Sequence, residues 1–205
     1  QDGTAYGRRP LTDSLRKNDA RNSARGIDLL DAFIYTNFDL GNLPTSLRVG
    51  KQVINWGESL ALQGGMNQFN SIDVSAIRTP GAEIREALLP EESVYANILL
   101  PEGLSFEAYY AFNWRNTELD AVGTFFSSND LFGPGGAYVN TVVPEQPNPD
   151  GAGTLHRVAS DEPDDQGQYG AKIGYWADWL NRGTEVAAYF VNYHSKLPIL
   201  EYSNG

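Results

Sequence analysis

A two-residue alternation of apolar and polar side chains recurs in six segments of this chain, and it constrains the fold more than any other feature. Successive side chains of a β-strand point to opposite faces, so a period of two predicts strands and not helices. In residues 104–114 the alternation outlasts the roughly five or six residues of an ordinary strand and matches the nine to eleven of a strand that crosses a bilayer. The predicted strands cover residues 27–40, 46–56, 93–100, 104–114, 168–179 and 184–194.

The connections between these segments are of two kinds. Tight turns at 41–44, 101–103 and 181–183 join the strands in pairs, whereas residues 57–92 and 115–167 form long connectors. If neighbouring strands pair antiparallel, all tight turns fall at one end of the sheet and both long connectors at the other. Outer-membrane barrels have this asymmetry, with short periplasmic turns and long external loops. We therefore expect an all-β fold, an antiparallel up-and-down transmembrane β-barrel.

We expect residues 1–205 to be part of a single barrel domain, in which residues 1–26 form a polar loop. Six strands are fewer than the eight of the smallest closed barrels, so we interpret the chain as a fragment of a longer protein. Within the first connector, Pro80 at a first helical position and Pro90 as a stop predict a short helix over 81–88.

Composition excludes several classes of protein. The formal net charge of −11 makes a nucleic-acid partner improbable, because the phosphate backbone would repel the chain. Mean hydropathy is −0.39, and no apolar run approaches the roughly 18 residues of a membrane helix. A barrel stays compatible with this value because its polar lumen face lowers the average. Cysteine is absent, so disulfides and thiolate metal sites are excluded.

Nothing in the sequence predicts catalysis. No G-x-S-x-G, phosphate-binding loop or dinucleotide fingerprint is present, and the two histidines, His156 and His194, lie far apart. Glu83 and Glu86 stand three apart on the predicted helix, where exposed charges are the simpler interpretation of two carboxylates. We expect neither an enzyme nor a cofactor.

Charged and polar residues on the polar faces of the predicted strands are candidates for a lumen lining. Such residues either set selectivity along a solute path or form a salt-bridged plug without a pore, and the sequence leaves both readings open. Large aromatic residues near strand ends are candidates for a lipid-facing girdle. The lumen candidates are Asp31, Arg48, Gln52, Glu107 and Lys172. The girdle candidates are Tyr110, Trp114, Tyr175 and Trp179.

Acidic residues in the second connector are weak candidates for calcium ligands. Asp120 and Asp130 supply carboxylate oxygens, which Ca²⁺ prefers, but neither belongs to a loop with EF-hand spacing. Our prediction is therefore no metal site.

Several motifs in fixed order resemble one protein family. The runs RVGKQVINWGES, NSIDVSAIRTPGAEIREALLP, LDAVGTFFSSNDLFGPGG and NYHSKLP are similar to uncharacterised proteobacterial outer-membrane proteins catalogued as domain of unknown function 1302, and the resemblance covers roughly residues 47–196. The resemblance implies a long barrel in the outer membrane of a Gram-negative bacterium, in contact with its lipids and handling hydrophobic or lipid-like molecules. It further implies an envelope lipoprotein and a resistance-nodulation-division transporter as partners, and it carries no site residues across. A homo-oligomer is compatible with it.

Two other functions remain open from the sequence. The first is a secreted β-sandwich that binds carbohydrate through exposed aromatic residues such as Trp56, Tyr109 and Trp176. The second is a surface protein in which the barrel is an anchor and the long loops provide structure or adhesion.

Overall fold

The computed structural model describes most of the chain between residues 31 and 199. Contacts divide the chain into two compact units: unit 1 comprises Gln1–Asp28, Asp73–Pro80 and Glu118–Glu162, and unit 2 comprises Leu29–Ile72, Gly81–Thr117 and Pro163–Gly205. The described residues are 31–56, 68–78, 80–81, 84–122, 124–127, 133–136, 138–140, 154–157, 160–181 and 183–199. The predicted loop at 1–26 and the candidate Asp130 lie outside them.

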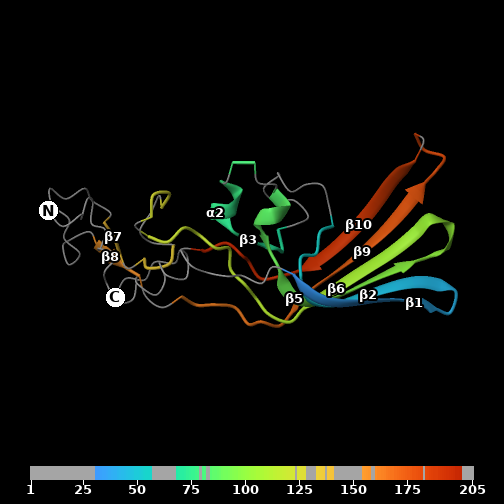
Figure 1. The fold of residues 1–205 in the computed structure, drawn as a ribbon, viewed down its shortest axis with the longest axis horizontal. Coiled ribbons are helices and arrows are strands. Elements are labelled where there is room, and N and C mark those ends of the chain that lie inside the picture. The colour runs from blue at the N-terminus through green and yellow to red at the C-terminus, as the bar shows by residue number, and fades with distance from the viewer. Residues whose placement is uncertain are drawn as a thin grey trace. The chain divides into compact units, whose positions relative to one another are not determined.

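Unit 2 is built on one six-stranded antiparallel sheet in the order β1-β2-β5-β6-β9-β10 (Figure 1). All six predicted strands are present, and each pairs with its neighbours in the predicted up-and-down order. Among the described residues β1 and β10 are the outer strands, so this sheet is not a closed barrel. The strands are β1 Ala32–Leu40, β2 Leu43–Gln52, β5 Glu91–Leu99, β6 Leu104–Ala111, β9 Gln168–Ala177 and β10 Thr184–Asn192.

The three tight turns lie together at one end of the sheet, as predicted (Figure 1). Each contains a residue with positive φ, which reverses the chain within a few residues. Gly41 has φ 67° between β1 and β2, Gly103 has φ 77° at the end of the 3-10 turn η4 (Pro101–Gly103), and Gly183 has φ 108° before β10. The connections β2 to β5 and β6 to β9 leave from the opposite end.

The two faces of the sheet differ in chemistry. One face, which we call the apolar face, is solvent-exposed: Ile34 and Phe190 are 81% and 61% exposed, and Ile173 is 49% exposed. The other, which we call the network face, carries charged and aromatic side chains, among them the buried Glu107 and Tyr109. The apolar face therefore faces outward while the side expected to be polar holds the core, an inversion of the usual soluble sheet.

The structure shifts several strand boundaries. β2 begins at Leu43, inside the predicted turn at 41–44, β5 covers Glu91–Leu99 in place of 93–100, and β9 and β10 each end two residues early. β6 ends at Ala111, three residues before the predicted end, because the side chain of Asn113 takes over the pairing: its Oδ1 accepts from Glu92 N at 2.9 Å. β2 ends at Gln52, and Lys51, which interrupts the apolar alternation, lies in continuous register opposite Glu92. The register shows no bulge at Lys51, which lies at the connector end of the apolar face.

Short elements lie within the long connectors. In unit 2, β3 (Ser71–Ile72) pairs with β4 (Leu88–Leu89), preceded by the 3-10 turn η3 (Ile84–Ala87). The α-helix predicted over 81–88 is therefore wrong in type and extent. Residues 84–87 form a 3-10 turn, and Leu88, at the predicted end of the helix, pairs with β3. Glu86 is exposed, and Glu83 lies outside the described residues.

Unit 1 contains an α-helical turn and a strand pair. α2 (Val74–Ile77) begins at Asp73, whose Oδ1 accepts from Ser75 N and Ala76 N, and β7 (Tyr138–Asn140) pairs with β8 (Thr154–His156). The sequence did not predict α2, because one turn is too short for helical periodicity to show. Within the described parts of both units, no helix has the length and apolar character to span a membrane.

Candidate functional site

The carboxylate of Glu107 is the centre of the network face. Glu107 lies on β6 and is 9% exposed, and its partner across the strand pair is Lys172 on β9. Lys172 Nζ lies 3.1 Å from Glu107 Oε1, while Oε2 accepts from Trp56 Nε1 at 2.8 Å and from the hydroxyl of Tyr95. Three donors converge on one buried carboxylate, which is the arrangement that keeps a buried charge from being costly.

Further charges extend this network across the sheet. Lys172 Nζ also lies 3.2 Å from Glu185 Oε1 on β10. On the other side the guanidinium carbon of Arg48 on β2 lies 4.4 Å from the centre of the Tyr95 ring, a cation-π distance. Charged groups from β2, β6, β9 and β10 thus lie along one face, with Tyr95 of β5 between them.

Two segments between β2 and β5 fold over the network face. Residues 53–56 follow β2 and residues 68–72 include β3, and Ile54, Trp56 and Phe69 form a buried cluster with Tyr95 and Tyr109 of the sheet. The Trp56 ring centre lies 5.1 Å from that of Tyr109, and Phe69 stacks on Tyr109 at 4.9 Å. Asn70 Nδ2 donates to Ile54 O at 2.9 Å and joins the two segments.

A second buried carboxylate, Glu91 at the start of β5, binds the chain that follows β10. Lys196 is 3% exposed, and its Nζ lies 2.8 and 2.9 Å from the two carboxylate oxygens of Glu91. Ser71 Oγ of β3 donates to Glu91 Oε1 at 2.7 Å. Burial lowers the pKa of Lys196 from its ordinary value, and the charge of Glu91 opposes this shift.

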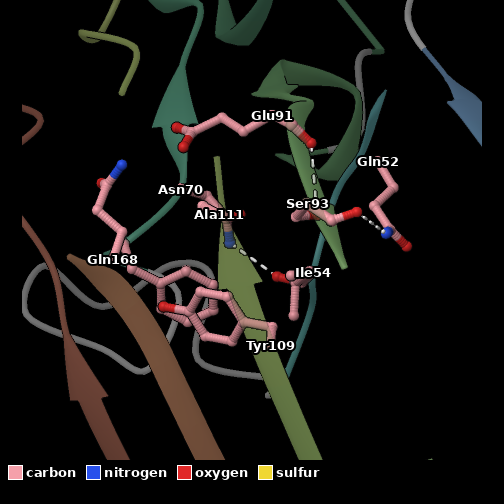
Figure 2. A pocket seen from close by; sticks show the side chains of 9 residues that line it. Gln52, Ile54, Asn70, Glu91, Ser93, Tyr109, Ala111 and Gln168 are labelled. Atoms are coloured by element: carbon pink, nitrogen blue, oxygen red, sulfur yellow. Dashed lines mark hydrogen bonds between the residues drawn. The ribbon is translucent and has the colours of Figure 1, made fainter. Parts of the chain in front are cut away.

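A small cavity lies between the buried aromatic cluster and the carboxylate of Glu91 (Figure 2). About 10 Å³ is open to the centre of a water molecule, so the cavity has room for about one water. Gln52 Nε2 donates to Ser93 O at 3.1 Å. Figure 2 shows this hydrogen bond on one side of the cavity and the Tyr109 ring on another. The cavity is lined by Gln52, Ile54, Phe69, Asn70, Glu91, Ser93, Tyr109, Ala111 and Gln168. This space is too small for a drug-sized ligand.

The structure brings together three of the five lumen candidates. Glu107 and Lys172 form an ion pair, and Arg48 lies over Tyr95, which also binds Glu107. Gln52 is buried at the connector end of the same face, and Asp31 is exposed just before β1.

Sequence reasoning missed the buried polar partners Ser71, Glu91 and Lys196 and the role of Trp56. Ser71, Lys196 and Trp56 lie within the quoted motif runs, and Glu91 directly follows one of them. Polar residues at fixed places inside these motifs were the available signal. The pairing of Glu91 with Lys196 could not be predicted from this signal, because 105 residues separate the two in the sequence.

The girdle candidates occupy both ends of the sheet. Tyr110 lies at the connector end of β6 on the apolar face, and Trp114 follows that strand, with Nε1 donating to Ser195 O at 3.2 Å. Tyr175 on β9 is 38% exposed near the hairpin end, and Trp179 in the following turn is 77% exposed. Their contact with lipid stays a prediction.

The remaining candidates are placed as follows. Asp120 in unit 1 binds the guanidinium of Arg78, and no three His, Asp or Glu side chains converge on a metal position in the part of the chain that the structure describes. His156 is exposed, while His194 Nε2 lies 3.0 Å from Gln166 O.

The expected exposure of the carbohydrate-binding aromatics is wrong for two of the three. Trp56 and Tyr109 are 3% and 6% exposed because they pack on each other over the network face, and only Trp176, at 48%, is accessible.

Comparison with known proteins assigns the family. The family model described as protein of unknown function (DUF1302) matches residues 1–204. Comparison with curated proteins and with solved structures gave no match. The match spans both units and all four motif runs, so the chain belongs to the DUF1302 family.

Proposed function

We propose that the six-stranded sheet is part of the wall of an outer-membrane β-barrel of a Gram-negative bacterium, through which hydrophobic or lipid-like molecules pass. The observation that carries the proposal is the inversion of the two faces: apolar side chains are exposed on one, and charged side chains are enclosed on the other. A barrel wall needs this distribution, with apolar residues toward lipid and polar residues toward the lumen.

Strand length and connectivity support the same proposal. Five of the six strands have nine or ten residues, which is the length of a tilted strand that crosses a bilayer. The sheet is an up-and-down meander with all its tight turns at one end, as in outer-membrane barrels.

The hydrophobic cargo is proposed from the resemblance to the family alone, and no pocket contributes to this part of the proposal. An envelope lipoprotein and a resistance-nodulation-division transporter are the partners we propose on the same ground. The charged network face is compatible with such cargo if the molecule passes beside aromatic rings and not through a wide aqueous channel, and the exposed rings of Phe33, Tyr35 and Trp176 lie on this face.

Membrane fractionation of the full protein tests the proposal. We expect the protein in the outer-membrane fraction, extracted only with detergent, with a gel mobility in SDS that changes on boiling. Purified protein in phospholipid vesicles should then accelerate the entry of a fluorescent fatty acid relative to empty vesicles. A protein that is freely soluble and migrates identically with and without boiling would refute the barrel, whereas a heat-modifiable barrel without fatty-acid entry would refute only the cargo.

A further inference from the structure

We infer that residues 53–56 and 68–72 form a fixed constriction inside the barrel, and that Trp56 is the residue that positions it. This inference rests on the proposed function, since it assigns the network face to the lumen. Both segments lie on that face: Trp56 Nε1 donates to Glu107, and its ring contacts Tyr109 and Tyr189, all of which point to the same side of the sheet. Chain that covers this face occupies part of the lumen.

The sheet has a recess that fits the Trp56 ring. Gly170 on β9 lies beneath it, and a Cβ atom at this position would stand 3.0 Å from Trp56 Cζ3 and 2.7 Å from Tyr109 Cε1. Both distances are well inside the ordinary van der Waals contact of about 3.5–4.0 Å. A Cβ atom here would also stand 2.9 Å from Phe190 O, so the glycine leaves the space in which the Tyr109 and Trp56 rings lie against the strand.

The second segment has its own anchor on the wall. Ser71 donates to Glu91, whose carboxylate also binds Lys196, and all three side chains are buried. Asn70 Nδ2 holds Ile54 O, so the two segments are joined to each other as well as to the sheet. A segment fixed at two buried carboxylates stays in place during passage and narrows the route by its own volume.

This arrangement makes Trp56 a positioning residue for a size filter. Removing its indole takes away the hydrogen bond to Glu107 and the ring contacts to Tyr109, Phe69 and Tyr189 together. The segment 53–56 then loses its hold on the wall, and we expect the passage to widen.

The test is unitary conductance of the purified full protein in planar bilayers, together with vesicle swelling in neutral sugars of increasing size. Trp56→Ala should raise the unitary conductance and admit a larger sugar than the unchanged protein does. Asn70→Ala removes only the hydrogen bond that joins the two segments, so it should raise the unitary conductance by less. Trp179→Ala is the matched control, because Trp179 lies 77% exposed in the β9–β10 turn, away from the cluster.

Gel mobility with and without boiling is recorded for every variant, and it separates the two ideas. A heat-modifiable Trp56→Ala barrel whose conductance and size limit equal those of the unchanged protein overturns the constriction and leaves the barrel standing. If the unchanged protein is itself not heat-modifiable, the barrel fails and the constriction with it.

Should Trp56→Ala not assemble, thiol labelling of a single cysteine supplies the decision. The 205 residues contain no cysteine, and any cysteine elsewhere in the full protein is first replaced by serine. Val191→Cys lies on β10 against the cluster, and its labelling should be slow in the unchanged background and faster with Asn70→Ala. Equal labelling rates would overturn the inference.

Discussion

The ion pair of Lys196 and Glu91 gives the sharpest test of how the connector ends are held. Both side chains are buried, and the ammonium lies 2.8 Å from the carboxylate. Removing one partner of a buried pair leaves an uncompensated charge and costs about 3–5 kcal/mol. Lys196→Met keeps an unbranched side chain of similar length and removes the charge. Since Glu91 keeps the Ser71 hydrogen bond, we expect a loss near the lower limit, about 3 kcal/mol.

A double-mutant cycle separates the pair from its surroundings. Glu91→Gln and Lys196→Met are measured singly and together by urea unfolding in phospholipid vesicles, followed by tryptophan fluorescence. The double variant has no unpaired charge, so its loss should be smaller than the sum of the single losses by about 1–3 kcal/mol, within the range found for contacting residues. Additive losses, or a single loss below about 1 kcal/mol, would refute the claim that the two charges depend on each other.

Three further substitutions test separate parts of the structure by the same unfolding measurement. Tyr95→Phe removes a hydrogen bond to the buried Glu107 carboxylate and should cost about 1.5–3 kcal/mol, whereas Tyr35→Phe, 66% exposed, should change stability by less than about 0.5 kcal/mol; equal effects would contradict the role given to Glu107. Gly50→Ala places a Cβ atom 2.3 Å from Ala32 O at a φ of 137°. It should lower the free energy of unfolding by more than Gly41→Ala, where φ is 67° but the space is open and the expected loss is about 1–2 kcal/mol. The reverse order would count against the register of β1 and β2. Ile173→Arg on the apolar face should cost about 2–4 kcal/mol if the face meets lipid and within about 0.5 kcal/mol if it meets water, with Asn37→Arg on the network face as the tolerated control.

The strands could be predicted well because alternation is a local property. Whether Phe106 and Tyr110 share a face depends only on their spacing, and the same holds for Glu107 and Tyr109, so the two faces of this strand were separated correctly. On β10 the alternation favours Ala187, Tyr189 and Val191 as the apolar set, and this is wrong: they lie on the network face, because this strand carries apolar residues on both faces. Three of the five neighbour pairings were equally accessible, because the tight turns at Gly41, Gly103 and Gly183 leave the strands they join no other partner as close. The pairings β2–β5 and β6–β9 span the long connectors and rested on the expected up-and-down order.

Predictions failed where distant parts of the chain decide the local structure. Residues 81–88 carry helix signals, yet Leu88 and Leu89 pair with β3, and β6 stops at Ala111 because Asn113 bonds to Glu92. In both places a hydrogen bond to another segment outweighs a propensity worth a fraction of a kcal/mol per residue.

The sequence by itself determined the six strands, their order, the end at which the turns gather, and the ion pair partners Glu107 and Lys172 as residues of one face. Only the tertiary structure decided that Trp56 is buried against Gly170 and Glu107, and that Glu91 binds Lys196 across 105 residues. The physical reason is range. Alternation and turn chemistry act between neighbours along the chain, whereas burial and ion pairing depend on which segments the folded sheet brings into contact.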